Sequence, residues 1–271
     1  LGTGVVISSD GIIITNHHVI ENAGNIVLYV YSKTDTKKYQ TKVIGIDRIT
    51  DIAVLKITTF PLPESIAQIT WSDKVDIGDD IYTIGHPQGM VWTVSKGVIG
   101  HLERNITSPW QTFIQHDSLI MPGNSGGGMF DEQGHLAGIN TILIPSADQT
   151  NTQAWSLSVN IEDVKWSFER IMKWGKPRRP ALNVMIDYND DLKQLSVTPN
   201  KGSNAQKSGI LDNSVLLKVN NNPVSNYSDL FNILKSQKDG DNITVETLTN
   251  KKVSTHTFEL ENWEVLEVKT D

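Results

Sequence analysis

Short apolar segments rich in β-branched residues alternate with turn-forming residues over the first 160 positions. Examples are residues 4–8 (GVVIS), 12–15 (IIIT), 52–57 (IAVLKI) and 91–99 (VWTVSKGVI). Residues 9–11 (SDG) separate the first two and predict a β-hairpin. Because the segments are short and β-branched, they indicate strands rather than buried helices. Their close spacing predicts a barrel or a sandwich.

The pattern changes after Asn160. Residues 161–174 (IEDVKWSFERIMKW) place apolar side chains at helical spacing and acids near the start, which predicts an amphipathic helix. Residues 175–180 (GKPRRP) end that helix and predict a linker. Residues 181–271 mix strands with a helix over 228–235, for which Ser228 is the expected N-cap. We therefore expect a first domain over 1–174, a linker over 175–180 and a smaller α+β domain over 181–271.

Composition narrows the classes of function. A length of 271 residues favours two domains. The 24 basic and 31 acidic residues give a net charge of −7, which disfavours nucleic-acid binding. The absence of cysteine excludes disulfides, thiolate catalysis and cysteine zinc sites, and fits an extracytoplasmic bacterial compartment. No apolar run reaches the length of an integral membrane span and no signal peptide is visible, so we expect a mature or trimmed chain.

One stretch, residues 121–128 (MPGNSGGG), combines four glycines with a single hydroxyl, that of Ser125. Glycine lets the backbone approach another group closely. A nucleophilic serine needs such a setting, with neighbouring N–H groups aimed at the oxygen that becomes negative. A glycine turn with an incidental serine explains the same stretch. The two interpretations differ in whether the chain also supplies a base and a carboxylate.

The seven histidines are the candidate bases. Four of them stand alone and are expected to be surface or locally hydrogen-bonded residues: His86, His101, His135 and His256. His116-Asp117 lies on the strand that enters the glycine stretch, whereas the pair at 17–18 ends a strongly apolar strand. Asp51 precedes another apolar strand, so the order is His, Asp, Ser. That order is typical of the chymotrypsin class and disfavours an α/β-hydrolase esterase.

At these positions the chain resembles the HtrA (DegP/Deg-type) serine proteases. Residues 15–19 (TNHHV), 50–57 (TDIAVLKI) and 122–127 (PGNSGG) are similar to the TNxHV, TDxAVLKI and PGNSGG motifs of that family. Residues 202–209 and 215–224 resemble parts of a PDZ domain. The resemblance implies a mainly β chain, in which a chymotrypsin-like double β-barrel protease domain precedes a smaller α+β PDZ domain.

The resemblance also implies roles for single residues. His18 is the general base, Asp51 orients it and Ser125 is the nucleophile. The oxyanion hole is expected from the N–H groups of Gly123 and Ser125, with Asn124. The resemblance implies no cofactor.

His17 stands where the family usually has asparagine, and we expect it to point to the opposite face of an extended segment from His18. A metal site made of the two histidines and Asp117 is an alternative that no further ligand pattern supports, so no metal is expected.

Specificity is expected from six residues that line the primary pocket: Leu119, Ile120, Met121, Ser156, Leu157 and Ser158. They are uncharged, which predicts cleavage after small or medium aliphatic residues. In the PDZ domain the expected peptide-binding residues are Leu182, Asn183, Val184 and Leu230. For the three apolar residues among them, a place in the domain core is an equally good explanation. Asn183 stands where the family usually has glycine, and asparagine tolerates a positive φ. Residues 104–110 and 149–153 are the expected regulatory loops.

Together these features predict an ATP-independent serine endopeptidase of protein quality control. It would cleave unfolded or misfolded polypeptides, and C-terminal peptides bound by the PDZ domain would regulate it. The resemblance further implies a homotrimer in the bacterial periplasm, soluble or anchored by a segment outside this sequence. The alternative is a peptide-binding chaperone or adaptor with a silent protease domain, against which the intact His18, Asp51 and Ser125 argue.

Overall fold

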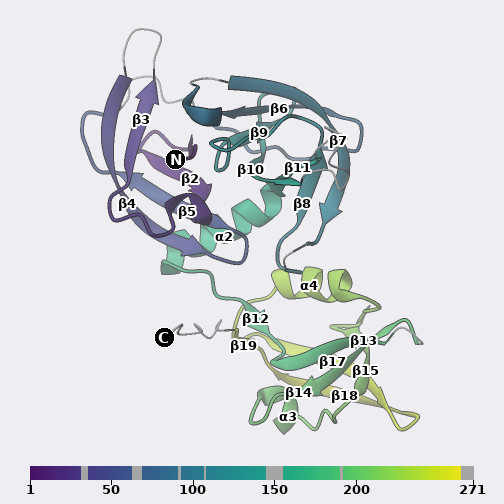
Figure 1. The fold of residues 1–271 in the computed structure, drawn as a ribbon. Helices are drawn as coiled ribbons and strands as arrows, with labels where there is room; N and C mark the ends of the chain where they lie inside the picture. The colour runs from purple at the N-terminus through teal and green to yellow at the C-terminus, as the bar shows by residue number, and fades with distance from the viewer. Residues whose placement is uncertain are drawn as a thin grey trace. The chain divides into compact units, whose positions relative to one another are not determined.

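The computed structural model describes residues 1–31, 36–62, 69–90, 93–106, 108–144, 155–189 and 192–263. These residues form two compact units, Leu1–Pro177 and Arg178–Asp271 (Figure 1). Most regular elements are strands, which confirms the mainly β prediction. No helix in the described part is long and apolar enough to cross a membrane.

The first half of the first unit is an antiparallel five-stranded sheet with the order β1-β2-β5-β4-β3. Its strands are β1 (Val5–Val6), β2 (Ile12–Asn16), β3 (Val27–Tyr31), β4 (Thr36–Asp47) and β5 (Ile52–Ile57), and the short helix α1 (His17–Ile20) follows β2. Every residue of β2 is buried, because alternate side chains enter two different apolar clusters. Ile14 belongs to one cluster and Ile13 to the other.

The second half is a closed barrel with the order β10-β11-β8-β7-β6-β9. Its strands are β6 (Asp80–Gly85), β7 (Thr93–Arg104), β8 (Phe113–His116), β9 (Gly128–Phe130), β10 (Leu136–Ile144) and β11 (Trp155–Asn160), with the one-turn helix η1 (Pro87–Gly89) after β6. Over the described residues the predicted double barrel is therefore one closed barrel and one open sheet. The sheet stays open because β1 pairs only with β2 and β3 only with β4. Residues 91–92 of the strand predicted over 91–99 lie outside the described chain, as do residue 107 and the loop over 149–153.

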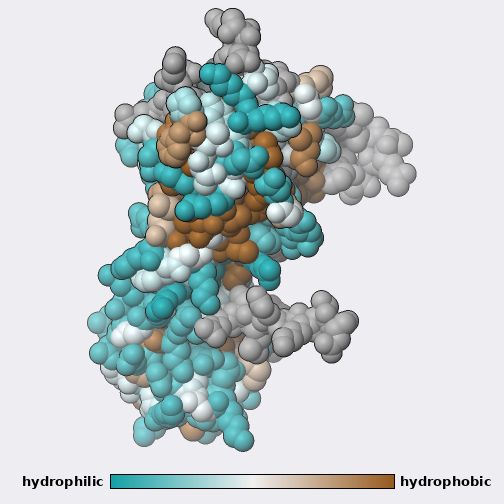
Figure 2. All heavy atoms as spheres, turned by 90° about the vertical axis from the view of Figure 1, so that its left-hand side faces the viewer, coloured by the Kyte–Doolittle hydropathy of each residue, from teal (hydrophilic) through white to brown (hydrophobic). Residues whose placement is uncertain are grey.

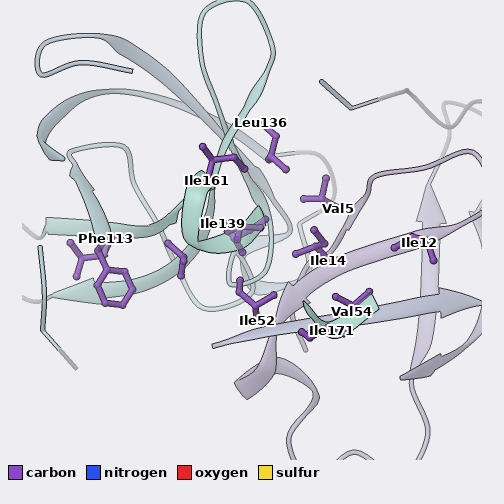
Figure 3. Packing of buried hydrophobic residues seen from close by; sticks show 13 residues of the cluster. Val5, Ile12, Ile14, Ile52, Val54, Phe113, Leu136, Ile139, Ile161 and Ile171 are labelled. Atoms are coloured by element: carbon purple, nitrogen blue, oxygen red, sulfur yellow. The ribbon is translucent and has the colours of Figure 1, made fainter. Parts of the chain in front are cut away.

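One hydrophobic cluster joins the sheet to the barrel. Ile14 and Ile52 of the sheet pack with Ile139 and Phe113 of the barrel (Figure 3). Burying each such side chain fully contributes about 1.5–3 kcal/mol. The ends of β2 and β5 are thereby fixed against the barrel strands, and these ends carry the residues of interest.

Helix α2 (Ile161–Trp174) seals this cluster, with Val164 and Ile171 buried in it. The Asn160 side chain accepts the Asp163 N–H at 2.8 Å, and Gly175 ends the helix with a φ of 75°. The helix predicted from periodicity is confirmed at both ends.

The second unit has a six-stranded antiparallel sheet, a separate two-stranded sheet of its first and last strands, and two short helices. Its elements are β12 (Pro180–Ala181), β13 (Val184–Asn189), β14 (Gln194–Pro199), α3 (Asn204–Lys207), β15 (Ser214–Val219), β16 (Asn222–Pro223), α4 (Tyr227–Lys235), β17 (Asn242–Thr249), β18 (Lys252–Glu259) and β19 (Glu261–Asn262). The prediction of Ser228 as the cap of α4 is wrong. Asn226 caps the helix instead, accepting the Asp229 N–H at 2.9 Å, so the helix begins at Tyr227.

Candidate active site

His18 stands in the single helical turn that follows β2. Its neighbour His17 is buried, with 8% of its surface exposed, and donates its backbone N–H to the Asp51 carbonyl at 3.0 Å. The His18 side chain is 44% exposed. The segment is helical and not extended as predicted, and successive residues of a helix also point in clearly different directions. His17 therefore fixes the backbone, and His18 carries the accessible imidazole.

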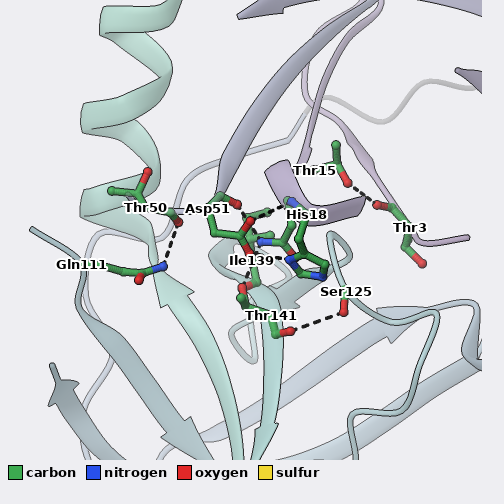
Figure 4. Close-up of polar contacts among 10 residues, drawn as sticks. Thr3, Thr15, His18, Thr50, Asp51, Gln111, Ser125, Ile139 and Thr141 are labelled. Atoms are coloured by element: carbon green, nitrogen blue, oxygen red, sulfur yellow. Dashed lines mark hydrogen bonds and ion pairs between the residues drawn. The ribbon is translucent and has the colours of Figure 1, made fainter. Parts of the chain in front are cut away.

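Both carboxylate oxygens of Asp51 are hydrogen-bonded to His18. Oδ2 lies 2.6 Å from His18 Nδ1, and Oδ1 accepts the His18 backbone N–H at 2.9 Å. A carboxylate only accepts hydrogen bonds, so Nδ1 carries the proton and Nε2 keeps its lone pair. The imidazole lies between Asp51 and Ser125 (Figure 4). The pair thus presents a basic nitrogen towards the serine.

The backbone around Asp51 is held from the core. Asp51 has a φ of 56°, and its carbonyl accepts the Asn16 side-chain N–H at 3.0 Å. The preceding residue Thr50 bonds through its hydroxyl to Ser167 of α2 at 2.8 Å, and its carbonyl accepts from Gln111 at 2.9 Å. Helix α2 and the barrel therefore fix the position of the carboxylate.

The hydrogen bond to Asp51 raises the pKa of His18 above its usual value. Burial opposes this shift, and the negative charges of Asp51 and Glu21 add to it. A raised pKa strengthens His18 as a base.

Ser125 lies in the loop between Ile120 and β9. Its hydroxyl donates to the Thr141 carbonyl at 3.3 Å (Figure 4). Within the described chain it forms no hydrogen bond to His18. Contacts between nucleophile and base are often long until substrate is bound, and a rotation about χ1 would turn the hydroxyl towards His18.

The loop before Ser125 turns at a glycine with a positive φ. Gly123 has a φ of 106°, and a Cβ there would overlap the His86 carbonyl oxygen, so only glycine fits. The N–H groups of Gly123 and Ser125 donate to no protein atom in the described chain. The Asn124 N–H, by contrast, donates to the Met121 carbonyl at 2.9 Å. The expectation that Asn124 helps to bind an oxyanion is therefore wrong for this conformation, and two donors remain.

The predicted pocket residues fall into two groups. Ile120, Ser156 and Ser158 are buried, whereas Leu119 is 55% exposed and Met121 is partly exposed. Leu157, which lies between the two serines on β11, points the other way into the hydrophobic cluster. Its assignment to the pocket is therefore wrong.

Beside these serines lies a buried histidine. His116 bonds through Nε2 to Ser158 Oγ at 2.9 Å, and Ser158 donates to Asn140 at 3.0 Å. Burial lowers the pKa of His116 to about 4, so it is neutral near pH 7 and adds no charge next to Ser158.

Three further histidines, His101, His135 and His256, each contact another residue of the fold. His101 accepts the Glu103 N–H, His135 contacts Asp131 and His256 bonds to Thr247. No three His, Asp or Glu side chains of the described residues converge as in a metal site.

In the second unit, Leu182 and Leu230 are buried at 4% and 0% exposure, which assigns them to the domain core rather than to a peptide groove. Val184 is half-buried at the start of β13. Asn183 has a φ of 56°, so the expectation that it tolerates this conformation is confirmed. Its side chain bonds to Asn200 at 2.7 Å and to Glu261 at 3.2 Å.

Three residues of the site are not predicted from the sequence: Asn16, Thr141 and Thr3. Asn16 bridges Asp51 and Thr141, donating to the Thr141 hydroxyl at 3.0 Å. Thr3 contacts the loop that holds Ser125. Buried polar residues inside apolar strands were the available signal for Asn16 and Thr141, whereas nothing in the sequence marks Thr3.

Comparisons with known proteins find trypsin-like and HtrA-type serine proteases. The trypsin-like peptidase domain family matches residues 2–139. A probable periplasmic serine endoprotease, DegP-like, of Pseudomonas putida is 31% identical over 93% of the chain, which spans 54% of that protein. Serine endoprotease DegS of Haemophilus influenzae is 31% identical over 93% of the chain and 74% of its own length. The structure of the HtrA-type protease AlgW with a decapeptide covers 97% of the chain and 83% of its own, with a TM-score of 0.86 and 27% identity.

Proposed function

The chain belongs to the HtrA family of trypsin-like serine endoproteases, and on that premise we propose that it is an ATP-independent endopeptidase that cleaves unfolded or misfolded polypeptides. The observation that carries the proposal is the His18 imidazole, bonded at 2.6 Å to Asp51 on one side and facing Ser125 on the other.

The proposed reaction follows from these positions. Ser125 Oγ attacks the peptide carbonyl carbon while His18 Nε2 takes its proton, and Asp51 stabilises the resulting imidazolium. The N–H groups of Gly123 and Ser125 bind the tetrahedral oxyanion, each donor being worth about 2.7–4 kcal/mol. The C–N bond then breaks as His18 protonates the leaving amine. Water, deprotonated by His18, cleaves the acyl-enzyme, releases the acid and restores Ser125.

A peptide-binding chaperone or adaptor with a silent protease domain is the competing function. Incubating the purified chain with casein in the absence of ATP separates the two. The protease hypothesis predicts that casein is progressively fragmented. Suppressed aggregation of an unfolded client with no cleavage would favour the chaperone.

For specificity, we propose a primary pocket for small or medium aliphatic side chains. The buried serine hydroxyls of β11 and the side chain of Ile120 are uncharged, and the neutral His116 behind Ser158 supplies no counter-charge. In a peptide library we expect cleavage after Ala, Val, Ile or Leu at least about tenfold faster than after charged residues, in line with the desolvation cost of an unpaired charge. A profile dominated by Arg, Lys or Asp would refute this pocket.

We propose that residues 181–271 are a PDZ domain that follows the linker over 175–180 and the protease domain over 1–174. The proposal is supported by β13, an edge strand of the sheet, beside which an extended peptide can add as a further strand. The positive φ of Asn183, directly before β13, supports a carboxylate-binding loop at this position. The Tyr227 hydroxyl donates to the Ile186 carbonyl at 3.1 Å, so an added strand has to displace it there.

Regulation through this unit makes a testable prediction. A free peptide ending in an aliphatic residue and carboxylate should raise the rate of casein cleavage several-fold, because its binding shifts the loops of the protease domain towards the active arrangement. The same peptide with an amidated C-terminus is the matched control and should have little effect. If peptide-free protein is fully active and neither peptide changes the rate, PDZ-mediated activation is ruled out.

We further propose a homotrimer in an extracytoplasmic compartment, in keeping with the periplasmic name of the Pseudomonas putida relative and with the absence of cysteine. On the face drawn in Figure 2, hydrophobic residues gather on the first unit. Exposed apolar patches of this kind are typical of interfaces. Light scattering that returns the mass of one chain at micromolar concentration would contradict self-association.

A further inference from the structure

The N-terminal segment touches the nucleophile loop at two points through one residue. The backbone N–H of Thr3 donates to the Ser125 carbonyl at 2.9 Å, and its hydroxyl donates to the Gly123 carbonyl at 2.7 Å. Gly123 and Ser125 are the two residues whose N–H groups are left without a protein acceptor. Thr3 therefore binds the carbonyl groups of the same two residues whose N–H groups have no protein acceptor in the described chain.

The direction of the Gly123 N–H depends on the conformation of the peptide planes around Gly123. A trans peptide points its C=O and the following N–H in opposite directions. The Gln88 N–H donates to the Pro122 carbonyl at 2.9 Å, which turns the Gly123 N–H away from Gln88. The Thr3 hydroxyl holds the next plane through the Gly123 carbonyl. The two bonds together fix φ and ψ of Gly123 at a conformation that other residues rarely adopt.

The Thr3 hydroxyl lies between the nucleophile loop and His86. Its single proton goes to the Gly123 carbonyl, which can only accept. Its oxygen accepts the His86 backbone N–H at 3.2 Å and lies 3.3 Å from His86 Nδ1. Burial lowers the pKa of His86, which favours the neutral form of this imidazole. The hydroxyl thus joins the nucleophile loop to the loop that carries Gln88.

Thr3 is also hydrogen-bonded to β2, the strand that ends next to the base His18. The Thr15 hydroxyl of β2 donates to the Thr3 carbonyl at 2.7 Å, and Thr15 is 2% exposed. A Cβ on Gly126 would overlap both the Thr15 hydroxyl and the Thr3 carbonyl oxygen, so glycine is needed for this close approach. Strand β2 ends at Asn16, two residues before His18. One strand therefore sets the position of the base directly and of the oxyanion donors through Thr3.

We propose that Thr3 is a positioning residue of the oxyanion hole, whose hydroxyl holds the peptide plane after Gly123 and so, together with the Gln88 bond to the plane before it, keeps the Gly123 backbone in the conformation that leaves its N–H unbonded. The inference rests on the proposed endopeptidase function and extends it. Thr3 touches no reacting atom, so its removal should act on the transition state and leave substrate binding in place.

The test measures kcat and KM separately on a quenched peptide chosen from the library experiment. Thr3→Val keeps the branched shape, loses the hydroxyl and should lower kcat about 10- to 100-fold with little change in KM, less than the 10²–10³-fold loss on deleting a donor itself. Thr3→Ser restores the hydroxyl and should return kcat to within roughly threefold of the wild type. Affinity for a peptide boronate, which forms a tetrahedral anion on the serine, should fall in parallel with kcat. Thr3→Ala, which introduces no bulk, replaces Thr3→Val if the latter does not fold.

Thr41→Val is the matched control. It also removes a threonine hydroxyl bonded to a carbonyl, that of Ile26 at 2.8 Å, but on β4 and away from the nucleophile loop. Its kcat should match the wild type. A folded Thr3→Val or Thr3→Ala variant with wild-type kcat, or a Thr3→Ser variant as impaired as they are, overturns the role of Thr3. Absence of hydrolysis by the wild-type protein would instead overturn the proposed function.

Discussion

Replacing Ser125 with alanine is expected to abolish casein degradation and to lower kcat by about 10⁶-fold, the loss typical of removing the nucleophile from a serine protease triad. The substitution removes only Oγ and its 3.3 Å bond to Thr141. The loop stays in place, because the Ser125 carbonyl still accepts the Thr3 N–H. An assay of fluorescent casein degradation checks the loss of activity, and the melting temperature checks that the fold is intact.

Ser236→Ala is a suitable control, since it also deletes a serine hydroxyl bonded to a carbonyl, that of Ile233 at 2.7 Å, in the second unit. It should degrade casein like the wild type. If the Ser125→Ala variant retained more than about one part in a hundred of the activity, another nucleophile would have to act, because the residual catalysis of a triad without its serine is far smaller.

The Asp51→Asn substitution is expected to lower kcat by about 10⁴-fold with the fold intact. Asparagine tolerates the positive φ of 56° at this position, and its side-chain oxygen can still accept the His18 N–H. Its NH₂ group, however, would donate to His18 Nδ1, which drives the proton to Nε2. The nitrogen that faces Ser125 would then be a donor and could not take the serine proton.

The pH dependence of kcat/KM, measured for the wild type and the Asp51→Asn variant, tests whether Asp51 raises the pKa of His18. Because Asp51 raises the pKa of His18 and the neutral imidazole is the base, the acid limb of kcat/KM for the wild type should lie above pH 6.5. In the Asp51→Asn variant, the limb of the remaining activity should move to lower pH. The protonated pair also favours folding, so this contribution is fully present below about pH 6.5 and is lost as pH rises through the folded-state pKa. An acid limb at the same pH in both proteins would mean that Asp51 does not set the pKa of His18.

The sequence predicts the elements that carry the site because their signals are local. The apolar runs before His18 and after Asp51 form β2 and β5, and both strands pack into one cluster with the barrel. Helix α2 is equally easy to predict from the sequence, since its cap, its apolar face and its terminal Gly175 all lie within one segment. These features give the order and position of His18 and Asp51 without knowledge of the tertiary structure.

The features that the sequence does not predict depend on contacts between distant segments. Whether the N–H of Asn124 is free depends on the Met121 carbonyl and on the turn between them, which a motif does not describe. Leu157 reads as a pocket residue from its place after the nucleophile, but the alternation of β11 turns it into the core. Thr3 lies 120 residues from Gly123, and only the folded chain brings them together.

The central claim is that His18, Asp51 and Ser125 form one assembled catalytic site, and covalent labelling with a fluorophosphonate tests it most directly. We expect the native protein to gain a single adduct, located on the peptide that contains Ser125. Labelling should be lost in the Ser125→Ala variant and on denaturation, and should be strongly slowed by Asp51→Asn. A folded wild-type protein that gains no adduct, or one that is labelled at a different serine, would contradict the account.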